Sequence, residues 1–146
     1  MRVALVAARN ALASQDIPVG AAIFNFTGEL IATGHNEREL HNDPTAHAEI
    51  VAIRSATEKL GDWHLSGYTI VVTLEPCAMC AGAIAQSRLQ TVVFGAWDEK
   101  AGAVGSVWDL LRDPRSTFRT EVRAGVLADE CGELIKSFIQ EVRTKD

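Results

Sequence analysis

The sequence predicts an α/β protein, a three-layer α/β/α sandwich with a five-stranded mixed sheet. Continuous runs of apolar and β-branched residues at 68–74 and 91–95 are typical of strands buried on both faces. Segments with helical spacing of apolar residues accompany the strands in the order αββαβαβαβα, which favours helices on both faces of one sheet. Only the hairpin of the first two strands has to be antiparallel, because its connection is too short for a crossover.

The N-terminal part of the chain is expected to begin with a helix and to continue into a hairpin. Val3, Val6 and Ala7 recur at helical spacing. Turn residues around Gly28 separate two apolar stretches, as in a β-hairpin. A polar loop at 37–42 follows, and Asp43-Pro44 then signals a helix, since Asp is a good N-cap and Pro suits the first helical position.

The C-terminal part alternates strands and helices. Glu75-Pro76 ends the first buried strand, and the small residues after Cys77 predict a closely packed helix. A Gly-rich loop at 96–105 follows the second buried strand, and Asp113-Pro114 ends a short helix. The expected helices are 1–14, 44–59, 77–86, 107–111 and 129–144, and the expected strands are 19–26, 30–33, 68–74, 91–95 and 120–123.

Length and composition indicate one domain, residues 1–146, with an ordinary hydrophobic core. The apolar fraction is 47%, and no apolar run approaches the roughly 18–20 residues of a membrane span. The net charge of −5 argues against a protein that holds nucleic acid mainly by bulk electrostatics, although it leaves room for a local basic patch. No signal peptide is expected, and the three cysteines are better explained by metal binding in a reducing cytoplasm than by disulfides.

Two short motifs carry the chemistry. His47-Ala48-Glu49 is followed, after 26 residues, by Pro76-Cys77-Ala78-Met79-Cys80. One imidazole and two thiolates are ligands for tetrahedral zinc, and three protein ligands leave the fourth position for water, as in catalytic zinc sites. Cys77 and Cys80 stand three apart at a helix start and therefore share one face. Glu49, beside a zinc-bound water, is placed to act as a proton shuttle.

The same residues are also found in other kinds of site. A C-x-x-C pair is also found in redox sites, but His47-x-Glu49 has no place in such a site. A structural zinc site needs a fourth ligand, for which His35, His41, His64 and Cys131 are the candidates. Cys131 is better explained as a small buried hydrophobic residue. Asn36 is equally compatible with a turn and with a contact to a base edge, and Trp97 is a candidate stacking surface.

The two motifs resemble the signature of the zinc-dependent cytidine and nucleobase deaminases. The likeness covers almost the whole chain, and two stretches outside the motifs, 93–106 and 125–131, are similar to the bacterial branch that deaminates the wobble adenosine of tRNA anticodons to inosine. The resemblance implies the cytidine deaminase-like fold, a cytoplasmic homodimer without a membrane segment, and an anticodon loop as substrate. A deaminase of a free base or nucleoside, of guanine or cytosine type, remains the enzyme alternative, and a structural-zinc binding module is the non-enzyme alternative.

The resemblance also implies roles for individual residues. His47, Cys77 and Cys80 would hold one zinc ion per subunit, and Glu49 would move the protons. Backbone N–H groups at the two helix starts, Ala48 and Cys77, would orient substrate or stabilise the intermediate. The substrate-binding residues are expected to be Asn36 at the purine edge, Ala48, and Asp98 and Lys100 on the loop that meets the anticodon. Trp97 departs from the family pattern, which often has a basic or polar residue there.

Overall fold

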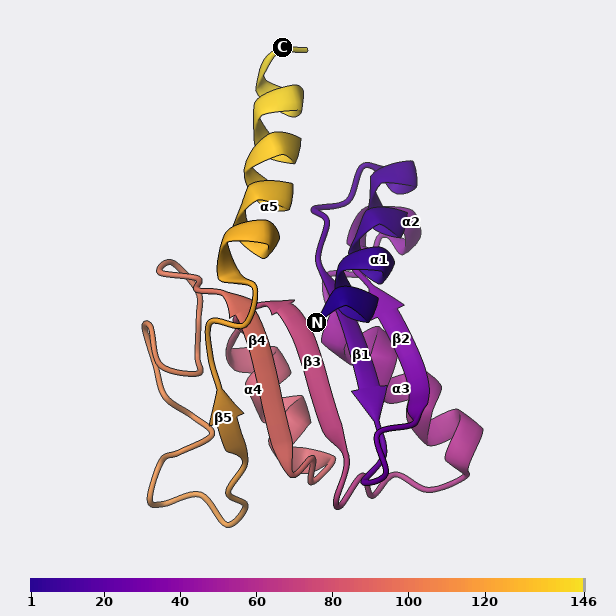
Figure 1. The fold of residues 1–146 in the computed structure, drawn as a ribbon, viewed down its shortest axis with the longest axis vertical. Helices are drawn as coiled ribbons and strands as arrows, with labels where there is room; N and C mark the ends of the chain where they lie inside the picture. Colours follow the sequence, from indigo (N-terminus) through magenta and orange to yellow (C-terminus); the bar gives the residue numbers. More distant parts are fainter. Residues whose placement is uncertain (146) are drawn as a thin grey trace.

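The computed structural model describes residues 1–145 and has a five-stranded mixed sheet at its centre (Figure 1). The strands are ordered β2-β1-β3-β4-β5 across the sheet. β1 runs antiparallel to both β2 and β3, whereas β4 is parallel to β3 and β5. The strands are β1 (Gly20–Phe24), β2 (Leu30–His35), β3 (Thr69–Leu74), β4 (Thr91–Ala96) and β5 (Glu121–Arg123). The predicted fold class is thus confirmed.

Helices cover both faces of the sheet and form the outer two layers. In Figure 1, α1 and α5 lie in front of the sheet, and α3 and α4 lie behind it. The core is divided accordingly, because Ala21 and Ile23 pack with the α3 side, whereas Ala22 packs with Ala4 of α1. The helices are α1 (Arg2–Asn10) with the 3-10 turn η1 (Ala11–Ser14), α2 (Arg38–His41), α3 (Ala48–Leu60), α4 (Ala78–Gln86) and α5 (Ala128–Arg143).

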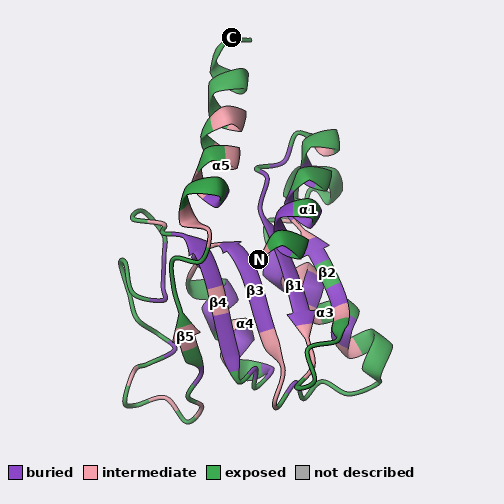
Figure 2. Cartoon of the chain, in the orientation of Figure 1, coloured by how far each residue is buried: buried purple, intermediate pink, exposed green. Residues whose placement is uncertain are grey.

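Close packing of α1 and α3 on the sheet depends on two glycines. A Cβ atom at Gly20 would lie 2.1 Å from the carbonyl oxygen of Ala4, and one at Gly34 would lie 2.5 Å from that of Ala48. No side chain fits at these positions, so the helices approach the backbone of β1 and β2 directly. Burial is greatest along β1, β3 and β4, while most of α5 is exposed or half-buried where it extends past the sheet (Figure 2).

Two predictions for residues 37–48 were wrong. The helix expected from residue 44 begins at Ala48. Asp43 does not cap it, because its Oδ1 accepts hydrogen bonds from the N–H and hydroxyl of Thr45 in a local turn. The loop expected at 37–42 contains the one-turn helix α2.

The short helix expected at 107–111 was also wrong. The N–H groups of Val107 and Trp108 both donate to the carbonyl of Gly102, and Val104 forms an isolated bridge with Asp109. The segment is therefore a compact turn folded back on the preceding loop. None of the helices that the structure describes is long and apolar enough to cross a membrane.

Candidate active site

The ends of two helices bring the sequence motifs together. His47 is the N-cap of α3 and Cys77 the N-cap of α4, both with extended backbone, and Cys80 lies in the first turn of α4. Nδ1 of His47 is 3.6 Å from Sγ of Cys77 and 3.5 Å from Sγ of Cys80. The three donor atoms lie within 4.8 Å of one another. His47 and Cys77 thus stand one residue before the helices rather than inside their first turns.

These distances fit a tetrahedral zinc ion. Zn–N and Zn–S bonds of about 2.1 and 2.3 Å at a tetrahedral angle place nitrogen and sulfur about 3.6 Å apart. The observed separations of 3.6 and 3.5 Å match that value. The backbone N–H of Cys80, in the first turn of α4, donates to Cys77 and favours its thiolate over the thiol. The donor set therefore suits zinc, and its three protein ligands leave one position for water.

The candidates for a fourth ligand lie elsewhere in residues 1–145. Nε2 of His35 and Nε2 of His41 both face the carboxylate of Glu37, at 3.6 and 3.1 Å. His64 pairs with Asp62. Cys131 is 1% exposed and packs in an apolar cluster under β4, as expected for a small hydrophobic residue. None of these side chains belongs to the donor group around His47.

The two thiols differ in their electrostatics. The hydrogen bond from Cys80, together with that from His47, lowers the pKa of Cys77 to about 3. The hydrogen bond to Cys77 and burial raise the pKa of Cys80 above its ordinary value, and the hydrogen bond with Cys77 raises the pKa of His47. Burial raises the pKa of Glu49, which is only 4% exposed. A carboxyl group with a raised pKa thus lies next to the thiol with the lowered pKa.

A cavity of about 220 Å³ opens onto this cluster. Ala48, Glu49 and two of the metal ligands line it, together with apolar and polar residues from the ends of β2 and β3 and from the loop after β4. Its size suits one small ligand, below the about 300–1,000 Å³ of drug-sized pockets. The lining residues are Ile17, Val19, Asn36, Arg38, His47, Ala48, Glu49, Leu74, Glu75, Cys77, Asp98 and Ala101.

Three of the four expected substrate-binding residues reach this cavity. Asn36 and Ala48 are buried in its wall, and Asp98 lines it from the loop after β4. The side-chain amide of Asn36 donates to the carbonyl of Ile17 at 3.2 Å, so that the side chain is held at one orientation. Lys100 lies outside the lining, exposed on the same loop, where its N–H donates to Asp98 Oδ1.

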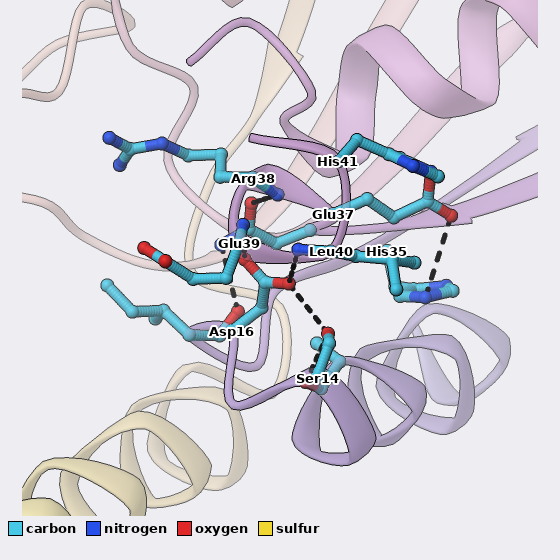
Figure 3. A network of polar contacts seen from close by, with 11 residues as sticks. Ser14, Asp16, His35, Glu37, Arg38, Glu39, Leu40 and His41 are labelled. Atoms are coloured by element: carbon cyan, nitrogen blue, oxygen red, sulfur yellow. Dashed lines mark hydrogen bonds and ion pairs between the residues drawn. The ribbon is translucent and has the colours of Figure 1, made fainter. Parts of the chain in front are cut away.

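A buried carboxylate that the sequence patterns did not single out, Asp16, is hydrogen-bonded to α2 (Figure 3). Asp16 is 1% exposed, and its two oxygens accept hydrogen bonds from the N–H groups of Glu39 and Leu40 and from the hydroxyl of Ser14. Burial raises the pKa of Asp16, but the hydrogen bonds from Ser14 and the two N–H groups outweigh it and lower the pKa overall. The short helix α2, which carries Arg38 to the cavity, is thus tied to the segment before β1.

The loop after β4 is braced in the same manner by Glu75, which was read in the sequence only as a strand-ending residue. Glu75 is 2% exposed and lines the cavity directly before Pro76 and Cys77. The sequence does contain a pattern that could have indicated both acids. Each lies one or two residues before a proline, in Asp16-Ile17-Pro18 and Glu75-Pro76, at the edge of an apolar stretch. An acid there is well placed to accept main-chain hydrogen bonds, although its partners cannot be named from spacing.

Comparison with known proteins agrees with this site. The model of the cytidine and deoxycytidylate deaminase zinc-binding region matches residues 1–96. The chain is 44% identical over 145 residues to the tRNA-specific adenosine deaminase of Bacillus subtilis strain 168, covering 99% of this chain and 89% of the relative.

Solved structures extend the comparison. A structure from work on A-to-I editing by tRNA:A34 deaminases at the wobble position of transfer RNA superposes with a TM-score of 0.87 at 41% identity, over 92% of this chain and 96% of that one. The guanine deaminase of Nitrosomonas europaea superposes with a TM-score of 0.78 at 29% identity, over 94% of this chain and 81% of that one. The chain therefore belongs to the zinc-dependent cytidine and deoxycytidylate deaminase family, in its tRNA-specific adenosine deaminase branch.

Proposed function

We propose that the protein catalyses the hydrolytic deamination of adenosine to inosine at the wobble position of a tRNA anticodon. The observation that carries this proposal is one cavity whose lining includes Glu49, next to the donor residues His47 and Cys80, and also Asn36. The near full-length similarity to a tRNA-specific adenosine deaminase supports the choice of substrate.

Zinc held by His47, Cys77 and Cys80 would supply Lewis acidity that lowers the pKa of a water molecule toward neutrality. Glu49 accepts the proton of that water while the oxygen adds to C6 of the purine, and it passes the proton to N1. Glu49 then moves the proton of the new C6 hydroxyl to the amino group, the C6–N bond breaks, and the C6 oxygen becomes a carbonyl as ammonia leaves. The products are inosine and ammonia, so one water is consumed for each adenosine.

The remaining lining residues would hold the base for this attack. The Asn36 amide recognises the purine edge, and the N–H of Ala48, at the first helical position of α3, has no intrahelical acceptor and is free for the substrate. Asp98 and Lys100 would contact the nucleotides around the target. An anticodon loop suits such a cavity, because its bases are already partly unstacked and one of them can be turned out at low cost.

We further propose that the protein acts as a homodimer in the cytoplasm. None of its three cysteines forms a disulfide, which is compatible with a reducing compartment. Large apolar side chains are exposed on the segment after β4, and surfaces of this kind often mark interfaces. They are Trp97, Val107, Trp108 and Leu110. Sedimentation equilibrium tests the dimer, and a monomer at micromolar concentration would contradict it.

The test of the activity is inosine formation on an anticodon stem-loop that carries adenosine at the wobble position. The control substrate has the adenosine moved to another loop position. Free guanine, cytosine and adenosine are assayed beside it, since the likeness to a guanine deaminase makes a free-base deaminase the second candidate. Turnover of free bases without turnover of the stem-loop would overturn the proposal. A metal bound by four protein ligands would overturn both deaminase functions in favour of a structural zinc site.

A further inference from the structure

The carboxylate of Glu75 is the point at which the loop after β4 is attached to the metal-binding segment. Oε1 of Glu75 accepts hydrogen bonds from the N–H of Asp98, at 3.3 Å, and from the hydroxyl of Ser106. Oε2 accepts the N–H groups of Val104 and Ser106, each at 3.1 Å. Four donors from one loop therefore converge on a single buried carboxylate, and each of its oxygens receives two of them.

Residues 98–106 form a loop, the 98–106 loop, whose backbone also lies close to this carboxylate. A Cβ atom at Gly102 would lie 2.1 Å from Oε2 of Glu75 and 2.5 Å from the carbonyl oxygen of Asp98. The N–H of Ala103 donates to the carbonyl of Pro76 at 2.8 Å. The loop is thus seated on residues 75–77, and the position of Gly102 admits no side chain while Glu75 remains in place.

We propose that Glu75 is a positioning residue for the substrate. Glu75 takes no part in the chemistry. Its carboxylate holds the loop residue Asp98, while its own backbone lies two residues before Cys77, so that Asp98 is kept at a fixed distance from this metal ligand. The metal-binding segment and the loop then form one rigid unit. A nucleotide bound by the loop is therefore correctly aligned with the reacting water. This inference rests on the proposed deaminase function.

The decisive variant is Glu75→Gln, which keeps the size and shape of the side chain. Because each carboxylate oxygen accepts two donors, an amide nitrogen at either position faces donors that it cannot satisfy. Loss of this anchor is expected to raise KM for the stem-loop about tenfold, the effect of one unsatisfied buried contact. The zinc content is expected to stay at one per chain, and kcat to change less than threefold.

Hydrogen exchange supplies a readout that does not depend on activity. In Glu75→Gln, exchange at the amides of Asp98, Val104 and Ser106 is expected to become faster, since these three donate to the carboxylate. The amide of Ala103 donates to a backbone carbonyl instead and serves as the internal reference. If the wild-type protein made no inosine, the proposed function would fail, while these exchange rates would still decide the role of Glu75 in the loop.

A second variant approaches the same contact from the loop. Gly102→Ala introduces a methyl group against Oε2 of Glu75 and should reproduce the rise in KM with zinc retained. The matched control is Thr120→Val, which removes a buried hydrogen bond to the carbonyl of Leu89 near the opposite end of β4. That variant is expected to lose stability without a change in KM. The inference is overturned if Glu75→Gln lowers kcat with KM unchanged, or if it loses zinc in proportion to activity.

Discussion

Oε2 of Glu75 lies 3.1 Å from the main-chain nitrogen of Val104, a contact between residues 29 positions apart in the chain. Asp16 makes corresponding contacts with Glu39 and Leu40, next to the lining residues Ile17 and Arg38. The donor group of His47, Cys77 and Cys80 is therefore flanked by two irregular segments, each held by one buried carboxylate. Irregular backbone offers few hydrogen bonds of its own, and a carboxylate with several N–H donors gives it the rigidity that a binding site requires.

Replacement of Glu49 by Gln is expected to lower turnover by about 10²–10⁴-fold while the zinc content stays at one per chain, because an amide cannot accept the proton of water. Single-turnover formation of inosine and metal analysis measure the two effects. Glu58→Gln, at an exposed position of the same helix, is the control and should behave as wild type. Near-full activity in Glu49→Gln would rule out the proposed role.

Cys77 and Cys80 are expected to bind zinc, whereas Cys131 is expected to be only a core residue. Cys80→Ala should lose zinc and activity, because it removes one of the three donors. Cys131→Ala should keep both and lose only about 1 kcal/mol of unfolding free energy, since it leaves a small cavity beneath β4. Zinc stoichiometry after dialysis separates the two variants. Zinc loss in Cys131→Ala would show that the third cysteine belongs to the site.

Removal of zinc is expected to abolish activity but to leave the sheet folded, because the donors stand at the starts of helices that pack in the core independently of the metal. The melting temperature should fall, since a ligand that binds only the folded state stabilises it. Circular dichroism and thermal melts before and after chelation measure this, with zinc and magnesium added back in parallel. Cooperative unfolding of the whole chain on chelation would contradict the expectation.

Asp16→Asn is expected to lower the unfolding free energy by about 1–3 kcal/mol at neutral pH, because the amide leaves at least one buried donor unsatisfied. Since the pKa of Asp16 is lowered from 3.8 by folding, its contribution is present above the unfolded pKa and is lost as pH falls through the folded value. The difference between wild type and variant should therefore shrink below about pH 4. Denaturant titrations of the metal-free proteins measure it, and a constant difference down to pH 2 would refute the assignment.

Much of the fold followed from local patterns. The buried strands were predicted from their continuous apolar runs, and the small-residue helix after Cys77 from composition and spacing. The predictions were wrong where one local sequence pattern is compatible with two different structures. Asp43-Pro44 is a good helix start, but here Asp43 caps a turn with Thr45, and the helix begins only at Ala48.

The sequence by itself determined which side chains could hold a metal, because the donor types and their places at helix starts are properties of short segments. His47, Cys77 and Cys80 had to meet once the two helices packed against the same sheet. Only the tertiary structure decided which carboxylates brace the cavity. The main-chain partners of Glu75 and Asp16 lie more than 20 residues away along the chain, and burial turns an ordinary acid into an anchor only when distant N–H groups surround it.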